Sequence, residues 1–202
     1  MSDSKHSRGY SNILESLEAT PPPLLPPGKS SDPDLTAKIA DCQAHPTIEA
    51  ALHLLNHDLP SAHFLVRHMQ SPPAIEGMLL HGILHRIEGD YDNARAWYGD
   101  VAKNETGRQL LDKAWNVGSG RGKERALEFV NKVENLKRKG KGDEAALNEE
   151  SRVEIRTVLS WCEEKFGTGK WEEASEAWVK PDKKIQEMGN NMVSGKQGHR
   201  DF

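Results

Sequence analysis

The spacing of apolar residues constrains this chain more than any other feature of its sequence. From residue 35 to residue 178 these residues recur at intervals of three or four positions, as Ile48, Leu52 and Leu55 do. Such spacing places apolar side chains on one face of an α-helix, whereas a half-buried strand would alternate polar and apolar residues. No convincing alternating segment occurs in the sequence. We therefore predict an all-α fold, an irregular bundle of antiparallel helical hairpins.

One helix is expected at the centre of this bundle. Residues 74–89, AIEGMLLHGILHRIEG, carry an apolar arc over more than half of the helical circumference, which is typical of a helix surrounded by others. Arg86 and Glu76 fall inside the arc, and a buried charge must be paired. Arg86 is expected to pair with Asp90, with Glu76 or with a carboxylate of another helix; the alternative is that it binds an anion.

The two ends of the chain differ in composition from the middle. Residues 1–35 include the stretch ATPPPLLPPGKSSDPD, in which closely spaced prolines prevent a helix, and we predict a disordered, proline-rich N-terminal tail. Residues 36–182 are predicted to form a single helical domain with a charged linker near 138–148. Residues 183–202 are poor in large apolar residues and are predicted to be a flexible C-terminal tail.

Charge and cysteine content exclude several classes of protein. The formal net charge is −4 and the isoelectric point is near 6.1, which argues against a general nucleic-acid or anionic-membrane binder. The sequence contains no run of 18 apolar residues and no secretory signal, so we expect no membrane association. Two cysteines are too few for a disulfide framework and predict reduced thiols in a cytoplasmic, or alternatively nuclear, protein.

Two segments of the sequence are similar to each other. GDYDNARAWY, which starts at Gly89, aligns with GKWEEASEAW, which starts at Gly169, and both are expected to form a helical hairpin. Around the first copy, Gly82, Ala94 and Tyr98 stand in the register of a tetratricopeptide unit. The two copies do not follow the 34-residue period of that repeat. A bundle that is only partly tetratricopeptide-like is therefore expected.

A longer segment resembles a group of uncharacterised helical proteins, chiefly bacterial. HGILHRIEGDYDNARAWY is similar to the segment HGIMHRREGDYSNAKYWF of that group over roughly 20 residues. The matching positions are His81, Gly82, His85, Arg86, Glu88, Gly89, Asp90, Tyr91, Asn93, Ala94 and Trp97. The resemblance implies a helical fold and no particular function. It also draws attention to His81, His85 and Arg86, because a plain helical repeat does not require them.

His81, His85 and Glu88 form the strongest candidate site. Residues four apart lie on one face of a helix, and Glu88 falls near the same line, so the three could bind one Zn²⁺ or Fe²⁺ ion. His63, in the preceding helix, could complete a metal or acid–base site, which makes these four residues the catalytic candidates. The order HxxxHxxE is not that of a known zinc motif such as HExxH. The alternative is that these histidines are structural and hydrogen-bonded.

A second HxxxH pair, His53 and His57, is not predicted to form a site. Both lie opposite the apolar face of the helix expected over residues 47–58. They are therefore predicted to be exposed to solvent.

Two functions remain open from the sequence. The first is a small soluble interaction or adaptor protein without a cofactor, which binds a protein partner in a groove between helices. Candidate groove residues are Arg86, Asp90, Asn93 and Trp97. The second is a metal-dependent or acid–base enzyme that uses Zn²⁺ or Fe²⁺ at the histidine site. Convergence of the four catalytic candidates in space would favour the second.

Overall fold

The computed structural model describes residues 2–179, with side chains from Gly9 onward. Within this range the chain forms α-helices and one short 3₁₀ helix, with no strand, so the predicted all-α fold is confirmed. The helices are α1 (Ser2–Glu18), α2 (Pro33–Asp41), α3 (Pro46–Leu55), α4 (Leu59–Val66), α5 (Ile75–Glu88), α6 (Tyr91–Val101), α7 (Glu105–Ala114), α8 (Gly122–Lys139) and α9 (Glu144–Phe166); the 3₁₀ helix η1 covers Ala174–Ala177. None of the helices in this range is long and apolar enough to cross a bilayer.

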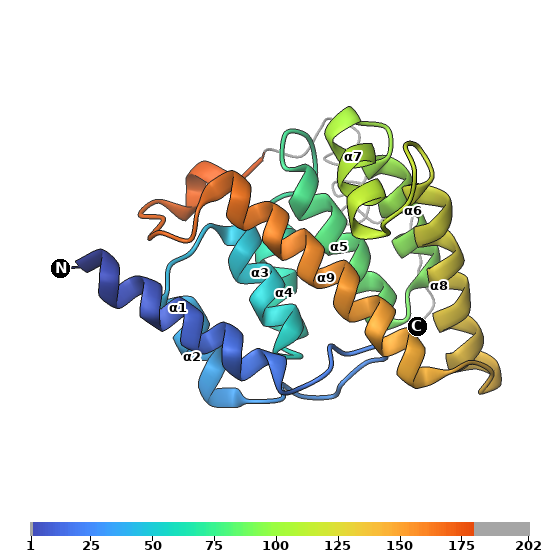
Figure 1. The fold of residues 1–202 in the computed structure, drawn as a ribbon, viewed down its shortest axis with the longest axis horizontal. Coiled ribbons are helices and arrows are strands. Elements are labelled where there is room, and N and C mark those ends of the chain that lie inside the picture. Colours follow the sequence, from blue (N-terminus) through green and yellow to red (C-terminus); the bar gives the residue numbers. More distant parts are fainter. Residues whose placement is uncertain (1, 180–202) are drawn as a thin grey trace, which may run out of the picture.

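Helix α5 is the centre of the bundle, as its wide apolar arc predicts. Every residue from Ile75 to Ile87 is buried. Helices α3, α4, α6, α7 and α9 all pack against it. Figure 1 shows the long helix α9 running across one face of the molecule, in front of α5.

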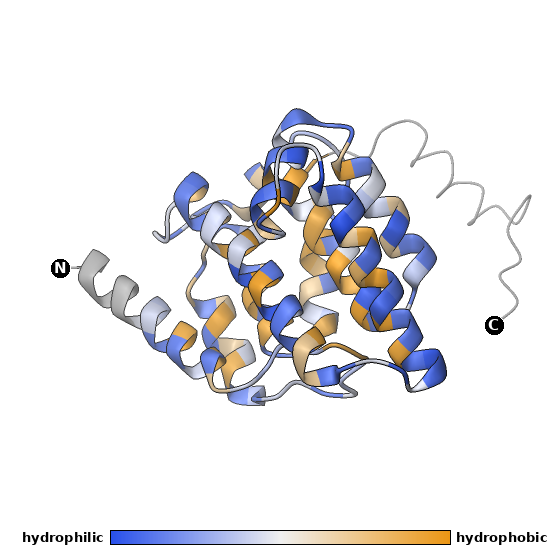
Figure 2. Ribbon diagram, turned by 45° about the vertical axis from the view of Figure 1, so that its right-hand side comes forward, coloured by the Kyte–Doolittle hydropathy of each residue, from blue (hydrophilic) through white to orange (hydrophobic). Residues whose placement is uncertain are grey.

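Consecutive helices pair as hairpins. The closest packing joins α3 to α4, α5 to α6 and α7 to α8, and α9 then contacts α3, α5, α7 and α8. Figure 2 shows hydrophobic residues gathered where helices face one another, with hydrophilic residues on the outer sides. Burial of these apolar faces is the main favourable contribution to folding.

The turn between α5 and α6 fixes the hairpin that carries the candidate site. Gly89 ends α5 with φ of 90°, a left-handed conformation that glycine adopts without strain. Asp90 then caps α6 by accepting a hydrogen bond from the backbone N–H of Asn93 at 3.2 Å. Gly82 lets the helices approach closely, because a Cβ atom there would lie 3.0 Å from Cβ of Trp97.

The second copy of the sequence repeat does not form a hairpin, so that prediction is wrong. Residues 169–178 are mostly loop and contain only the 3₁₀ helix η1. The backbone N–H of Trp171 donates to the carbonyl of Gln43 at 2.7 Å, which holds this segment against the α2–α3 turn. Whether the first copy is tetratricopeptide-like stays a prediction.

Ala94 tests the close packing of α5 and α6. Its side chain is fully buried in the α5–α6 hairpin. Replacing Ala94 with leucine should overpack the contact and lower the free energy of unfolding by roughly 1–3 kcal/mol. Thermal or urea denaturation would measure this, with the exposed Ala96→Leu on the same helix as the control. Equal stability of both variants would place Ala94 outside a tight interface.

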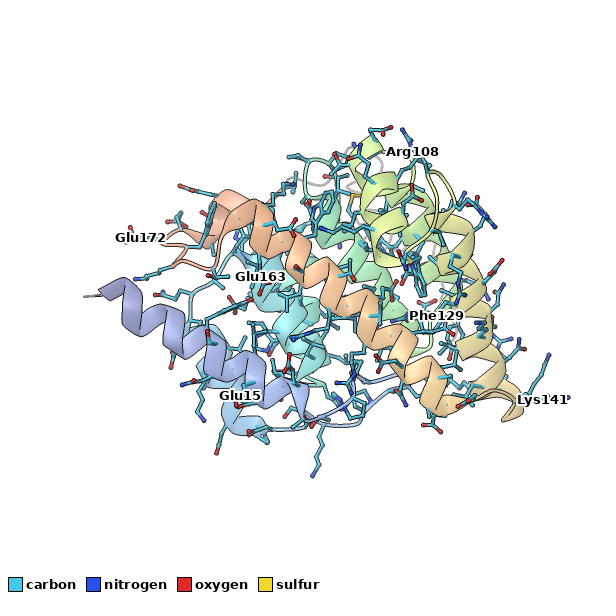
Figure 3. The ribbon with its side chains drawn as sticks, viewed as in Figure 1. Glu15, Arg108, Phe129, Lys141, Glu163 and Glu172 are labelled. Carbon is cyan, nitrogen blue, oxygen red and sulfur yellow. The ribbon has the colours of Figure 1, made fainter. Side chains whose placement is uncertain are left out.

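The N-terminal region differs from the predicted disordered tail. Tyr10, Ile13 and Leu17 recur at helical spacing along α1 and are buried. The hydroxyl of Tyr10 donates to Glu163 Oε1 at 2.5 Å, and Figure 3 labels Glu163 on α9. Leu24 in the proline-rich stretch is also buried. The prolines interrupt the helix there without preventing packing, and composition alone concealed the apolar face of α1.

The other predicted boundaries also change. Helix α8 ends at Lys139 and α9 begins at Glu144, so the charged linker covers 140–143 and is shorter than the predicted 138–148. Asp143 caps α9 by accepting from the backbone N–H of Ala146 at 3.0 Å, which starts the helix early. The predicted C-terminal tail, 183–202, lies outside the described residues.

Candidate metal centre

Three histidines from two helices meet in space. His63 is on α4, and His81 and His85 stand one turn apart on α5. One ligand nitrogen of each lies within 4.8 Å of those of the other two. The centroid of the His63 ring is 5.3 Å from that of His81 and 5.7 Å from that of His85. The hairpin packing of α4 on α5 thus brings together residues that are 18 or more positions apart in the sequence.

The three histidines differ in exposure. His81 is 3% exposed and His85 is 9% exposed. The side chain of His63, by contrast, is 42% exposed. The cluster is therefore closed on the α5 side and reaches solvent at His63.

Glu88 and Asn93 hold His85 in one orientation. Nδ1 of His85 lies 3.0 Å from Oε2 of Glu88, and its Nε2 lies 3.1 Å from Nδ2 of Asn93. The amide nitrogen of Asn93 donates, so Nε2 of His85 accepts and Nδ1 carries the proton that it donates to Glu88. The second carboxylate oxygen of Glu88 is 3.6 Å from Nδ1 of His63. The carboxylate of Glu88 thus faces Nδ1 of both His85 and His63. Nε2 of each of these rings points away from that carboxylate.

His81 lacks such a partner. Its ring is stacked between His85, at a centroid distance of 4.7 Å, and Trp97, at 4.5 Å. Its Nδ1 is buried and has no hydrogen-bond partner among the described residues. Burial, together with the neighbouring His85 and His63, lowers the pKa of His81 from 6.5 to about 3. The imidazole is therefore neutral near pH 7, and a neutral imidazole can act as a metal ligand.

The chemistry of the cluster suits a transition metal. Burial also lowers the pKa of His63, although the carboxylate of Glu88 opposes this shift. Neutral imidazoles are preferred ligands of Zn²⁺ and Fe²⁺. Zn–N bonds of about 2.0 Å in a tetrahedral site separate two nitrogens by about 3.3 Å. The imidazoles would need to close in by up to roughly 1.5 Å around an ion, and the more exposed His63 has the greatest freedom to move.

The arrangement changes the predicted ligand set. The sequence placed His81, His85 and Glu88 on one stripe, but the group of mutually close ligand atoms consists of His63, His81 and His85. Glu88 lies behind two of these imidazoles and contacts both. A carboxylate in that position orients ligand histidines and raises their basicity.

The four predicted groove residues separate into two pairs. Asn93 and Trp97 border the histidine cluster through their contacts with His85 and His81. Asp90 is the cap of α6. Arg86 is fully buried, and its Nη1 donates to Glu154 Oε2 on α9 at 2.7 Å. The structural alternative for Arg86, a carboxylate of another helix, is therefore correct, and Arg86 does not line a groove.

Two other polar residues differ from the sequence prediction, His53 in its burial and Glu76 in its partners. His53 is 2% exposed, not solvent-exposed, and its Nδ1 lies 3.2 Å from Oδ2 of Asp58. Glu76 is buried as expected, but its partners are Trp161 and Lys165 on α9. These partners are more than 80 positions away in the sequence, so no local pattern identifies them.

Comparisons of the chain with protein-family models, with curated proteins and with solved structures found no match. The resemblance to the uncharacterised helical group therefore stays a prediction.

Proposed function

We propose that this protein is a metal-dependent enzyme that binds one Zn²⁺ or Fe²⁺ ion through His63, His81 and His85. The observation that carries the proposal is the buried Nδ1 of His81, which has no hydrogen-bond partner among the described residues. An unsatisfied buried polar atom costs about 1–3 kcal/mol. A metal ion bound to that nitrogen would remove the cost, because a metal ion accepts the lone pair of a neutral imidazole.

The shape of the cluster favours a catalytic ion over a structural one. Structural zinc sites are closed by four protein ligands, whereas catalytic sites use three and leave a position for water. The cluster offers three histidines and is open to solvent at His63. A bound ion would lower the pKa of its water and supply hydroxide near neutral pH.

Glu88 and Asn93 have positioning roles in this proposal. Glu88 fixes the protonated Nδ1 of His85 and faces Nδ1 of His63. In this arrangement both imidazoles would present Nε2 to a bound ion. Asn93, now 3.1 Å from Nε2 of His85, would have to release this nitrogen when metal binds. The hypothesis of an interaction protein stays a prediction, although the burial of Arg86 removes one of its groove residues.

Metal binding is tested on the full chain after treatment with a chelator. We expect one equivalent of Zn²⁺ to bind in calorimetry, and Co²⁺ to give the visible bands of a four-coordinate site. At a hundredfold excess of free metal over its Kd, binding should stabilise the protein by about 2.7 kcal/mol. His81→Phe, which keeps a flat ring between His85 and Trp97, should abolish both the binding and the stabilisation.

Two further measurements separate this site from other histidines and from simple metal storage. His57→Asn is the control variant, because His57 lies outside the cluster, and it should bind metal as the wild type does. The Zn²⁺-loaded protein should hydrolyse an activated ester with a rate that rises through the pKa of the bound water, and His81→Phe should lose this activity. Binding that survives in His81→Phe would contradict the site, and binding without hydrolysis would contradict the enzymatic function.

A further inference from the structure

A separate cavity of about 320 Å³ lies between the start of α3, the end of α9 and the segment that follows α9. Small-molecule sites range from about 300 to 1,000 Å³ and are mostly apolar, with a few converging polar groups. This cavity is at the lower end of that range. The aromatic rings of Phe166, Trp171 and Trp178 line it together with the pair Glu76 and Lys165. None of the three clustered histidines borders it.

The polar end of the cavity is built around Glu76. Its side chain is 1% exposed, and Oε1 accepts hydrogen bonds from Trp161 Nε1 at 2.9 Å and from Lys165 Nζ at 2.8 Å. Both of these hydrogen bonds go to Oε1. The carboxylate is thus fixed by two partners on one oxygen and retains accepting capacity on the other.

One positively charged group already lies against an aromatic ring that lines the cavity. The ammonium of Lys165 lies 5.0 Å from the centroid of the Phe166 ring, beside Glu76. The ring of His45 stacks parallel to Phe166 at a centroid distance of 3.7 Å. It also makes an edge contact with Trp171 at a centroid distance of 4.7 Å. Burial lowers the pKa of His45 to about 4, so this ring adds no positive charge near pH 7.

The charges around the cavity favour a positively charged ligand. Glu76 and Glu176 are among the lining residues, and Lys165 is the only lysine or arginine among the described residues that line it. The formal charge of these described residues near pH 7 is therefore −1. Aromatic faces attract cations through their ring quadrupole, and this attraction is largest when the cation is desolvated. An anionic ligand would meet the carboxylates and the electron-rich ring faces.

We propose that this cavity binds a small organic monocation, an amine on an apolar body. The ammonium group would hydrogen-bond to Oε2 of Glu76, and the apolar body would pack between Trp171 and Trp178. The side chain of Lys165 can move away from Phe166 when the ligand binds, because it is 41% exposed and can turn to solvent. The site is independent of the proposed metal centre.

A charge series of matched probes tests this proposal on the full chain. The probes are 2-phenylethylamine, 2-phenylethanol and 3-phenylpropanoate, which share an apolar body and carry a positive, a neutral and a negative end. Titration would be followed by calorimetry and by tryptophan fluorescence. We expect saturable binding of the amine, at least tenfold weaker binding of the alcohol and no binding of the carboxylate. Equal or tighter binding of the carboxylate, or no binding of the amine, would overturn the proposal.

Substitutions locate the site. Glu176→Gln removes an exposed charge from the lining without disturbing the core, and we expect it to weaken amine binding by roughly three- to tenfold. Glu172→Gln is the matched control, because Glu172, labelled in Figure 3, is exposed on the same segment and does not line the cavity. Trp178→Ala should abolish binding while the helical circular dichroism stays unchanged. His81→Phe should bind the amine as the wild type does, and equal binding by all four variants would refute this location.

Discussion

Replacing Glu154 with glutamine should lower the free energy of unfolding by about 3–5 kcal/mol. Glu154 and Arg86 are both fully buried, and their side chains form an ion pair at 2.7 Å. The hydroxyl of Tyr98 donates to the other carboxylate oxygen at 2.6 Å, and Arg86 Nη2 donates to Ser151 at 3.1 Å. Glutamine has nearly the same shape but no charge, so the guanidinium of Arg86 would remain buried without a counter-ion.

The position of this network explains the size of the expected effect. It joins α5, α6 and α9, three helices that meet at the centre of the bundle. The guanidinium of Arg86 also lies 4.5 Å from the centroid of the Phe129 ring on α8, which is labelled in Figure 3. Arg86 therefore contacts α8 and α9 directly, and the bond of Tyr98 to Glu154 extends the network to α6.

A surface ion pair on the same helix provides the control. Glu150 lies one turn before Glu154 and pairs with Arg125 and Lys132, but its side chain is 26% exposed. Glu150→Gln should change stability by less than about 1 kcal/mol, because exposed ion pairs contribute little. Urea denaturation of both variants would measure the difference. A loss below about 1 kcal/mol in Glu154→Gln would show that the buried pair does not stabilise the core as argued.

A double variant distinguishes the effect of an unpaired buried charge from the effect of changed packing. Arg86→Met combined with Glu154→Leu removes both charges and keeps apolar volume, so it should be more stable than Glu154→Gln alone. The recovery should be incomplete, because the hydroxyl of Tyr98 would lose its acceptor. A double variant that is less stable than Glu154→Gln would mean that packing, not the unpaired charge, determines the loss.

The local features of the fold were predictable because they depend on short-range spacing. The wide apolar arc of residues 74–89 predicts a central helix, and α5 is buried over nearly its whole length. The segment that starts at Gly89 predicts a helical hairpin, and Gly89 ends α5 there with a positive φ. The need for a partner for Arg86 also follows from its place in the arc. The identity of that partner, Glu154, does not, because it is 68 positions away.

The wrong predictions concern features that depend on contacts between residues distant in the sequence. His53 was placed on a polar face by periodicity within its helix, but α3 is covered by neighbours on several sides, and the side chain is buried. The proline-rich composition of residues 1–35 concealed the three apolar residues of α1 that pack on the core. At the candidate site, helical spacing correctly joined His81 and His85. Only the packing of α4 on α5 shows that His63 replaces Glu88 in the set of close ligand atoms.

Acid should destabilise this protein through two buried histidines. Burial lowers the pKa of His81 to about 3 and that of His45 to about 4, against about 6.5 in an unfolded chain. Between these values the unfolded chain binds more protons than the folded chain, so stability rises with pH in this window. The contribution of each histidine is complete above pH 6.5 and is lost as the pH falls toward its folded pKa. Each should lose up to about 1.4 kcal/mol per pH unit between pH 6 and pH 4.

Together the two histidines should lower the free energy of unfolding by several kcal/mol between pH 7 and pH 4, measured by urea denaturation with a chelator present. His81→Phe isolates one of them, because phenylalanine fills the stack beside Trp97 and does not titrate. Its slope between pH 6 and pH 4 should be smaller than that of the wild type by up to about 1.4 kcal/mol per pH unit. An unchanged slope in His81→Phe would mean that folding does not lower the pKa of His81, so that its imidazole is not held away from water as described.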